Sequence, residues 1–285
     1  MTIVVTGATG ELGRHVVRHL LARGVKPAEI IAGGRNEEVL ETLSALGVLT
    51  ARIDYSDPST LDAAFAGADK VLLISGSEVG KRVLQHKAVI DAARKVGAGL
   101  VYTSAPKAST SSLILAPDHK ATEEMLEQSG LSYTVLRNNW YFENYNNTIL
   151  QAAQTGSILT SAGDGRVASA TRSEYAEAAA VALLSDQFAG DVLELGGDHA
   201  WDMRELADAV EAASGREVGV DNVSSDEHVA ALQGFGLDEG TAGFVAALDA
   251  NIADGLLADT DGSLARLIGR PTTSLKDYVQ ELIGK

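Results

Sequence analysis

The sequence predicts an α/β fold in which helices cover both faces of a doubly wound parallel sheet. Short apolar runs alternate with helical patterns through the first half of the chain, and this rhythm is typical of strands joined by helical crossovers. Glycines mark the ends of the expected helices at Gly24, Gly47, Gly67 and Gly130. The length of 285 residues leaves room for a second, smaller lobe.

The stretch over residues 2–13 is the feature on which the rest of the prediction depends. An apolar run ends in Gly7, Gly10 and Gly13, each separated from the next by two residues. A helical pattern follows directly, with apolar residues on one face at Leu12, Val16, Val17, Leu20 and Leu21. A strand, a glycine turn and a helix in this order are typical of the Rossmann-like fold, where a dinucleotide pyrophosphate meets the helix N-terminus. The alternative is a glycine-rich turn that binds nothing.

Each glycine of this turn has a distinct expected role. Gly7 can adopt the backbone angles that let the chain leave the strand sharply. Gly10 has no side chain that would keep a phosphate away from the backbone, and Gly13 lets the helix lie close to the sheet.

The end of the second strand, expected over residues 30–33, decides which cofactor the fold would hold. A carboxylate there would hydrogen-bond the ribose 2′-hydroxyl of NAD, whereas an arginine can pair with the 2′-phosphate of NADP. Arg35 follows this strand and favours NADP(H); the alternative is a solvated surface arginine. Asp54 follows the third strand, where it either accepts a hydrogen bond from the adenine amino group or caps the next turn.

Further strands complete the sheet domain. Strands three, four and five are expected over residues 48–53, 71–74 and 100–103. Ser75, Gly76 and Ser77 follow strand four, where small residues let the ribose and nicotinamide of a cofactor approach. Thr103, at the end of strand five, is also expected among the cofactor-binding residues.

A second group of candidate binding residues follows the sixth strand, expected over residues 133–136. The Ser-, Thr- and Ala-rich loop over residues 106–116 is long for a compact domain and is a candidate substrate loop. Residues 137–145 then form the densest aromatic and amide cluster in a chain with only 5% aromatic residues. Polar amides among flat rings suit a planar ligand. The alternative is a helix start that packs on the core.

Beyond Gly156 the pattern loosens, and we expect a smaller mixed α/β lobe. Residues 162–165 read as a turn between short strands, an alanine-rich helix is expected from Ser173, and residues 192–195 read as a further strand. We therefore divide the chain into a cofactor-binding sheet domain over residues 1–155 and a substrate-capping lobe over residues 156–285, partly interleaved with the sheet domain.

The composition argues against several classes of function. The net charge of −16 and the absence of a basic run argue against binding to nucleic acid or to an anionic membrane surface. We expect neither a membrane span nor a signal peptide, because the apolar runs are too short. The absence of cysteine excludes disulfides and thiolate chemistry and fits a cytoplasmic protein. No metal is expected, since no His, Asp and Glu set stands at ligand spacing.

Short motifs along essentially the whole chain match one family pattern in order. They are Thr6-Gly7-Ala8-Thr9-Gly10 with Leu12-Gly13, Asp54-Tyr55, Leu73-Ile74-Ser75 with Ser77-Glu78-Val79-Gly80, Tyr102-Thr103-Ser104, Thr122-Glu123 with Met125-Leu126, Ser129-Gly130, Leu136-Arg137-Asn138 with Trp140-Tyr141, Ser169-Ala170-Thr171-Arg172, and Leu267-Ile268-Gly269 with Pro271-Thr272-Thr273. On these motifs the chain resembles the NmrA-like group of atypical short-chain dehydrogenases/reductases. Within this group it is most similar to bacterial NADPH-dependent quinone oxidoreductases and triphenylmethane reductases.

The resemblance implies a set of cofactor contacts. It implies that the pyrophosphate is wrapped by Gly7, Ala8, Thr9, Gly10, Glu11 and Leu12, and that Arg35 meets the 2′-phosphate. It also implies that the nicotinamide side is lined by Ser75, Gly76, Ser77, Asn139, Trp140, Tyr141, Phe142, Glu143 and Asn144, with Arg172 nearby.

Ordinary short-chain dehydrogenases use a tyrosine and a lysine four residues later, and this pair is absent here. None of the 7 tyrosines has a lysine at that spacing. A quinone does not strictly need such an acid, because hydride addition gives a hydroquinone anion that the ring stabilises. We therefore expect hydride transfer from NADPH to a quinone or a similar planar acceptor. The alternative is a non-catalytic NADP(H)-binding redox sensor of the NmrA type.

Two candidate proton donors remain. His119 occupies the place of a histidine in the quinone and dye reductases that the chain resembles, and Lys120 that of the catalytic lysine in plant isoflavone reductases. Adjacent helical residues point about 100° apart, so only one is expected to face a cleft. The alternative for each is a solvated surface residue, and reduction of another carbonyl or enone with Lys120 as the acid stays open. A homodimer is expected, because dimers are common.

Overall fold

The computed structural model describes residues 1–78 and 80–284, and its internal contacts divide the chain into two compact units. Unit 1 comprises Met1–Ser109, Leu115–Asn138 and Arg172–Leu195. Unit 2 comprises Thr110–Ile114, Asn139–Thr171 and Gly196–Lys285. Each unit therefore brings together segments that lie far apart in the sequence.

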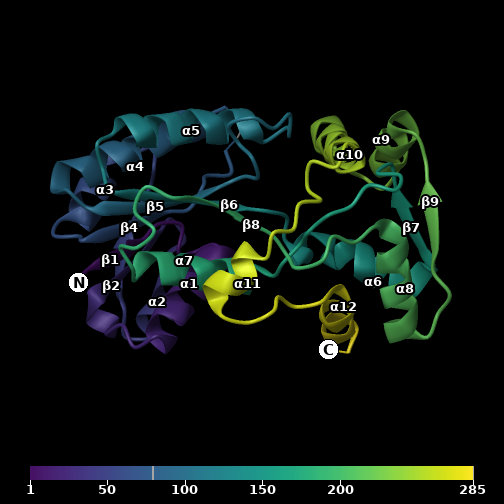
Figure 1. Cartoon of the computed structure of the whole chain (residues 1–285), viewed down its shortest axis with the longest axis horizontal. Coiled ribbons are helices and arrows are strands. Elements are labelled where there is room, and N and C mark those ends of the chain that lie inside the picture. Colours follow the sequence, from purple (N-terminus) through teal and green to yellow (C-terminus); the bar gives the residue numbers. More distant parts are fainter. Residues whose placement is uncertain (79, 285) are drawn as a thin grey trace. The chain divides into compact units, whose positions relative to one another are not determined.

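A parallel sheet forms the centre of unit 1 (Figure 1). Its strands in the described part of the chain are β1 (Ile3–Val5), β2 (Ile30–Gly34), β3 (Leu49–Arg52), β4 (Lys70–Leu73), β5 (Gly99–Ser104), β6 (Tyr133–Asn138) and β8 (Val192–Leu195). Their order is β3-β2-β1-β4-β5-β6-β8, and each neighbouring pair runs parallel. The direction of winding reverses between β1 and β4, which is where open sheets of this kind bind ligands. The predicted doubly wound α/β fold is confirmed.

Helices cover both faces of this sheet. They are α1 (Glu11–Ala22), α2 (Glu37–Ser44), α3 (Pro58–Phe65), α4 (Arg82–Val96), α5 (Ala116–Gln128) and α7 (Arg172–Leu183), with a 3₁₀ turn η1 (Pro27–Glu29). Figure 1 shows α3, α4 and α5 on one face, and α1, α2 and α7 on the other. Among the described residues, no helix combines the length and hydrophobicity needed to cross a bilayer.

The apolar run of β4 explains why this strand occupies the middle of the sheet. Val71, Leu72 and Leu73 are all fully buried, as expected for a strand with helices on both faces. Since successive side chains point to opposite faces, Val71 and Leu73 share one core cluster with Phe65 of α3 and Val89 of α4.

The glycine turn holds α1 against the first strand. Gly7 has a φ of +61°, which favours glycine, as its predicted role requires. A Cβ atom on Gly13 would lie only 2.4 Å from the carbonyl oxygen of Gly7 and 2.6 Å from Cα of Ala8. The helix therefore approaches the turn more closely than any side chain at this position would allow.

Unit 2 contains a pair of parallel strands, β7 (Ser157–Thr160) and β9 (Gly219–Asn222), surrounded by helices. The helices in its described part are η2 (Phe142–Tyr145), α6 (Asn146–Thr155), α8 (Met203–Ser214), α9 (Ser225–Gly234), α10 (Glu239–Ala253), α11 (Ser263–Ile268) and α12 (Leu275–Ile283). Capping boxes begin two of them, since Asp202 caps α8 together with Glu205 and Ser224 caps α9 together with Glu227.

The expected turn between short strands at residues 162–165 is only half right. β7 ends at Thr160, but directly after the turn the described chain forms two isolated bridges and no strand. Val167 pairs with Trp201 in an antiparallel bridge, and Ala170 pairs with Tyr141 in a parallel one. The partner of β7 is β9, about sixty residues further along the chain. Local turn residues could not indicate such a distant pairing.

Gly13→Ala should destabilise the protein. We expect the free energy of unfolding to fall by about 1–3 kcal/mol, because the added methyl group must push the helix away from backbone atoms that cannot move easily. Urea unfolding followed by circular dichroism measures this change. Gly234→Ala in α9 is the control, because no atom lies within 4 Å of its added Cβ, and it should leave stability unchanged or slightly raised. Equal stabilities of the two variants would contradict the close approach of α1.

Candidate functional site

A pocket of about 300 Å³ lies at the carboxyl ends of β1, β2, β3 and β4 in unit 1. The segment that follows each of these strands contributes to its walls. These segments are the glycine turn after β1, Arg35 after β2, residues 53–55 after β3 and residues 74–78 after β4. The residues that line it are Gly7, Thr9, Gly10, Gly34, Arg35, Ile53, Asp54, Tyr55, Ile74, Ser75, Gly76, Ser77, Glu78 and Gln85.

Many of the predicted cofactor-binding residues meet in this pocket. They are Gly7, Thr9, Gly10, Arg35, Asp54, Ser75, Gly76 and Ser77. Three other predicted residues of unit 1 do not line it. Ala8 and Leu12 are buried, and Oγ1 of Thr103 accepts a hydrogen bond from the backbone N–H of the lining residue Ser75 at 3.0 Å. Glu11 pairs with Arg172 at 2.9 Å, so these two predicted residues also meet. Val79 of the Ser77–Gly80 motif lies outside the described residues.

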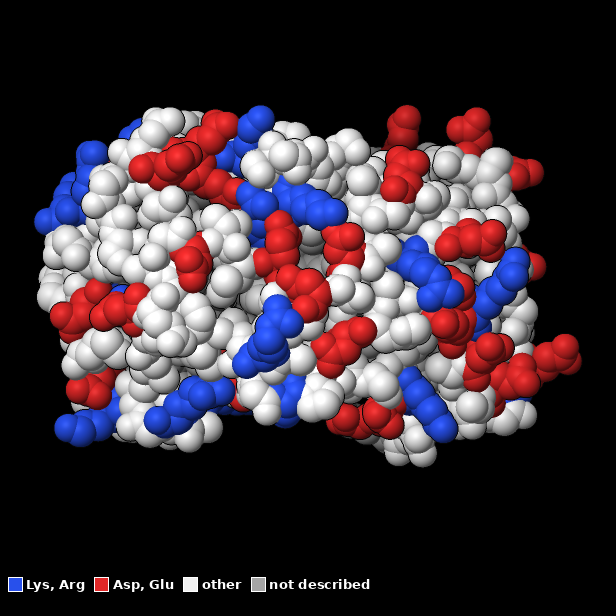
Figure 2. All heavy atoms as spheres, viewed as in Figure 1, with Lys and Arg blue, Asp and Glu red and all other residues white. Residues whose placement is uncertain are grey.

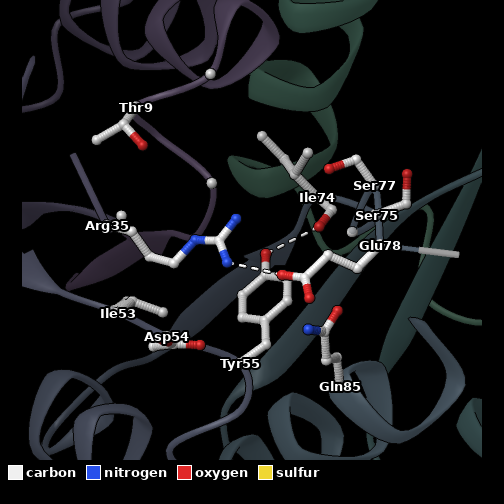
Figure 3. Close-up of a pocket in the computed structure, with 14 residues that line it drawn as sticks. Thr9, Arg35, Ile53, Asp54, Tyr55, Ile74, Ser75, Ser77, Glu78 and Gln85 are labelled. Atoms are coloured by element: carbon white, nitrogen blue, oxygen red, sulfur yellow. Dashed lines mark hydrogen bonds and ion pairs between the residues drawn. The ribbon is translucent and has the colours of Figure 1, made fainter. Parts of the chain in front are cut away.

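An ion pair spans the pocket between Arg35 and Glu78. Nη1 of Arg35 lies 2.7 Å from Oε1 of Glu78, and Lys81 lies 3.3 Å from the other carboxylate oxygen. Figure 3 shows the two side chains reaching toward each other from opposite sides of the pocket. The guanidinium of Arg35 holds the pKa of the Glu78 carboxyl below its usual value, so Glu78 is an anion at neutral pH.

Tyr55 lines the pocket, and its hydroxyl donates to the carbonyl oxygen of Ile74 at 2.8 Å (Figure 3). The same hydroxyl lies 2.5 Å from Oγ1 of Thr6. Burial raises the pKa of this phenol, so the hydroxyl keeps its proton. These contacts join β1, the loop after β3 and the loop after β4. Neither Tyr55 nor Glu78 was predicted as a site residue, although both stand in the motifs quoted above.

Asp54 fulfils one of the two expectations for it. Its carboxylate accepts a hydrogen bond from the backbone N–H of Ser56 at 2.9 Å, which caps the turn after β3. The same residue lines the pocket. The capping alternative is therefore confirmed, and a contact to adenine stays a prediction.

The predicted members of the aromatic and amide cluster belong to unit 2. Some of them are buried in its core, and others are half-buried or exposed. Asn139 is buried and donates to the carbonyl oxygen of Leu257 at 3.1 Å, and Phe142 is buried between Trp201 and Tyr278. These two predicted residues have the core role that was the alternative for the cluster. The other predicted members, Trp140, Tyr141, Glu143 and Asn144, are half-buried or exposed.

The candidate acid His119 lies in a buried network beneath β5. Its Nδ1 is 2.7 Å from the hydroxyl of Tyr102, and a second buried histidine, His86, accepts a hydrogen bond from the backbone N–H of Gly76 at Nε2. A neutral His86 therefore carries its proton on Nδ1, which faces Oγ1 of Thr122 at 2.9 Å. Burial lowers the pKa of both His86 and His119 to about 3.

The burial of His119 and the position of Lys120 limit what these two residues can do as proton donors. A histidine with a pKa of about 3 is neutral at pH 7 and holds no excess proton to donate. Lys120 is exposed on α5, and neither residue lines the pocket at the ends of β1–β4.

The buried histidines predict how stability depends on pH. Between pH 5 and 7 the unfolded chain takes up protons that the folded chain does not, because burial holds both histidine pKa values far below 6.5. Stability should therefore rise with pH in this range. His119→Gln removes one such group and should reduce the slope by up to about 1.4 kcal/mol per pH unit. Urea titrations at several pH values measure the slopes, and identical slopes would contradict a neutral, buried His119.

Comparison with known proteins places this geometry in a family. Residues 7–186 match the family described as NAD(P)H-binding. The chain is 43% identical over 283 residues to quinone oxidoreductase 2 of Escherichia coli, with 99% of each chain covered. The crystal structure of that Escherichia coli enzyme complexed with NADPH matches with a TM-score of 0.95, 42% identity and 99% coverage of each chain. The triphenylmethane reductase of Citrobacter sp. complexed with NADP(H) matches with a TM-score of 0.94 and 37% identity over 99% of this chain and 100% of that chain.

These matches cover the glycine turn, the sheet and the second unit together, and they confirm the resemblance on which the sequence prediction rests. The chain belongs to the NAD(P)H-binding family.

Proposed function

We propose that this protein is an NADPH-dependent oxidoreductase that transfers hydride to quinones or similar planar electron acceptors. The observation that carries the proposal is the pocket at the ends of β1–β4, in which a glycine turn, a helix N-terminus and Arg35 surround one cavity. The similar quinone oxidoreductase and triphenylmethane reductase, each determined with this cofactor, support both the cofactor and the class of acceptor.

The residues of the pocket fit a phosphorylated dinucleotide. α1 begins after Gly10, which offers no side chain to cap the first-turn N–H groups, so these groups are available to a pyrophosphate. Arg35 provides a guanidinium for the 2′-phosphate, and Ser75–Ser77 would face the ribose on the nicotinamide side. When bound, NADPH supplies the hydride.

Local groups must hold this anionic cofactor against the charge of the whole chain. The net charge is −16, and Figure 2 shows acidic and basic side chains interspersed on one face. The excess of negative side chains repels the anionic NADPH, but in salt this repulsion is screened over about 10 Å. The N-terminus of α1 and the guanidinium of Arg35 act at contact distance and so decide binding.

Planar electron acceptors such as quinones do not require the protein to supply an acid catalyst. The Tyr and Lys pair of ordinary short-chain dehydrogenases is absent from the sequence, and the buried His119 is neutral. A quinone accepts hydride to give an anion that its own ring stabilises, and water can protonate this anion later. Positioning of the acceptor then supplies most of the catalysis.

A second candidate function is a non-catalytic NADP(H)-binding redox sensor. The same missing Tyr and Lys pair favours it, because a sensor needs cofactor binding without an acid. Tight NADP(H) binding without turnover of any acceptor would support this function and contradict the reductase.

A cytoplasmic location and a homodimer are further parts of the proposal.

The decisive experiment follows oxidation of NADPH and of NADH by absorbance while benzoquinones and naphthoquinones are added. We expect enzyme-dependent oxidation with strong preference for NADPH. Arg35→Ala should lower kcat/KM for NADPH about tenfold to a hundredfold, because charge-assisted hydrogen bonds to the 2′-phosphate are lost, and should leave NADH almost unchanged.

Arg52→Ala is the matched control, because Arg52 ends the neighbouring strand β3 and lies outside the pocket. It should leave the preference for NADPH intact. Equal effects of the Arg35 and Arg52 substitutions would show that only general charge matters. Saturable NADPH binding with no oxidation by any quinone would contradict the reductase.

Glu78→Gln should tighten NADPH binding. Glu78 competes with the 2′-phosphate for Arg35 and adds a negative charge near it, so its removal should lower the Kd of NADPH by about two- to fivefold, with little effect on NADH. Fluorescence titration measures both constants. Glu37→Gln removes an exposed carboxylate that lies 3.8 Å from Arg52 and serves as the control. Weaker NADPH binding by the Glu78 variant would mean that Glu78 holds the cofactor or positions Arg35.

A further inference from the structure

The loop that follows β4 in unit 1 is held by side chains from other elements. Three successive backbone N–H groups, from Ile74 to Gly76, donate to side chains of the β1 turn, β5 and α4. The acceptor for Gly76 is Nε2 of His86, at 2.9 Å, and the carbonyl oxygen of Gly76 accepts from Nε of Arg82 at 2.6 Å. Side chains of α4 thus engage both backbone polar groups of Gly76.

The same two side chains of α4 also contact α5. Nη1 of Arg82 lies 3.3 Å from Oδ2 of Asp118, and Nδ1 of His86 lies 2.9 Å from Oγ1 of Thr122. Arg82 and His86 are four residues apart in α4, and Asp118 and Thr122 are four residues apart in α5, so each pair lies on one face of its helix. Two parallel chains of contacts therefore lead from Gly76 through α4 to α5.

The hydrogen bonds of His86 fix the direction in which it acts. The hydroxyl of Thr122 donates to the carbonyl oxygen of Asp118 at 2.8 Å, so its oxygen is left to accept from Nδ1–H of His86. Nε2 is then free of a proton and accepts from Gly76. His86 is fully buried, and burial lowers its pKa to about 3, so it keeps this neutral form at pH 7.

The loop that is held in this way forms one wall of the cofactor pocket. Ser75, Gly76 and Ser77 all line it, and Figure 3 shows Ser75 and Ser77 across the pocket from Arg35. Neither Arg82 nor His86 lines the pocket. A wall that is already ordered costs less free energy to bind against, and a reacting ring that is displaced by about 1 Å loses about a hundredfold in rate. Both α4 residues can therefore affect a bound cofactor through Gly76.

We propose that His86 and Arg82 are positioning residues, which hold Gly76 in place and thereby set the position of the nicotinamide end of the cofactor for hydride transfer. They act through the backbone of the loop after β4. The inference rests on the proposed function, because it takes the nicotinamide side to lie at Ser75–Ser77.

The first test compares His86→Leu with His86→Gln in the full chain. Leucine cannot accept a hydrogen bond from Gly76, whereas the side-chain oxygen of glutamine can. At saturating NADPH and 1,4-naphthoquinone, kcat should fall about tenfold to a hundredfold in His86→Leu and should recover in His86→Gln. Arg82→Met removes the donor to the carbonyl oxygen of Gly76 and should also lower kcat. This variant decides the test if His86→Leu does not fold.

A second pair of measurements needs no turnover. The anisotropy of nicotinamide fluorescence from NADPH bound at saturation should be high in the wild type, fall in His86→Leu and Arg82→Met, and return in His86→Gln. Adenosine 2′,5′-bisphosphate carries the 2′-phosphate but lacks the nicotinamide. Its Kd should stay unchanged in all three variants.

Thr134→Val is the control for the loss of a buried hydrogen bond. Thr134 is buried near the start of β6, outside the pocket, and its hydroxyl donates to the carbonyl oxygen of Phe188 at 2.9 Å. This variant should lower the melting temperature without changing kcat or the anisotropy. The same pattern in His86→Leu would assign His86 a structural role and overturn the proposal.

The remaining outcomes separate this inference from the proposed function. If the anisotropy changes as expected but the wild type oxidises no NADPH with the quinone, the positioning role stands and the reductase is wrong. If the wild type reduces the quinone and both the leucine and methionine variants match it in kcat and anisotropy, the reductase stands and the positioning role is wrong. Equal losses in His86→Leu and His86→Gln, a low anisotropy in the wild type, or weaker binding of the bisphosphate would also overturn the positioning role.

Discussion

The site depends on how closely backbone segments approach one another around the first glycine turn. The N–H of Gly10 donates to the carbonyl oxygen of Gly7 at 3.0 Å, and the N–H of Ala8 donates to that of Gly33 at 2.8 Å. A Cβ atom on Gly13 or Gly34 would lie within about 2.5 Å of its neighbours. Backbone hydrogen bonds and contacts that only glycine permits thus fix the turn between β1, β2 and α1. This arrangement places the N-terminus of α1 beside the ends of the strands.

A second constraint concerns Arg35, a cation that an acidic chain places at the carboxyl edge of its sheet. A carboxylate of the same chain is available there to pair with it. Arg35 comes from β2 and Glu78 from the loop after β4, and they meet because the two strands lie on either side of β1. In this structure the carboxylate of Glu78 occupies the guanidinium of Arg35, and the hydroxyl of Tyr55 links the loops after β3 and β4. A phosphate that bound Arg35, as proposed, would have to replace Glu78 as its partner. The free energy of this exchange would then contribute to the affinity alongside the charge of Arg35.

The sequence predicts the order of strands and helices well because each element has a local signal. The apolar run of β4 and the glycine turn are such signals, and so is the proline at the start of α3. Roles that depend on distant contacts carry no such signal. Tyr55 and Glu78 enter the pocket through partners in other strands and loops, and the burial of His119 depends on Tyr102 of β5. Within the aromatic and amide cluster, Phe142 is buried because Trp201 and Tyr278, much later in the chain, pack against it. Trp140 and Asn144 of the same cluster line a pocket of unit 2 instead.

The electrostatics of the buried groups limit the chemistry that this protein can perform. Burial keeps His86 and His119 neutral and keeps the phenols of Tyr55 and Tyr145 protonated at pH 7, so each of them can hydrogen-bond but none is a strong acid. A simple ketone needs proton transfer in the step that adds hydride, whereas a quinone or a cationic dye yields a product that is stable without it. Buried groups that are all uncharged at neutral pH therefore suit such acceptors better than they suit ordinary carbonyl compounds.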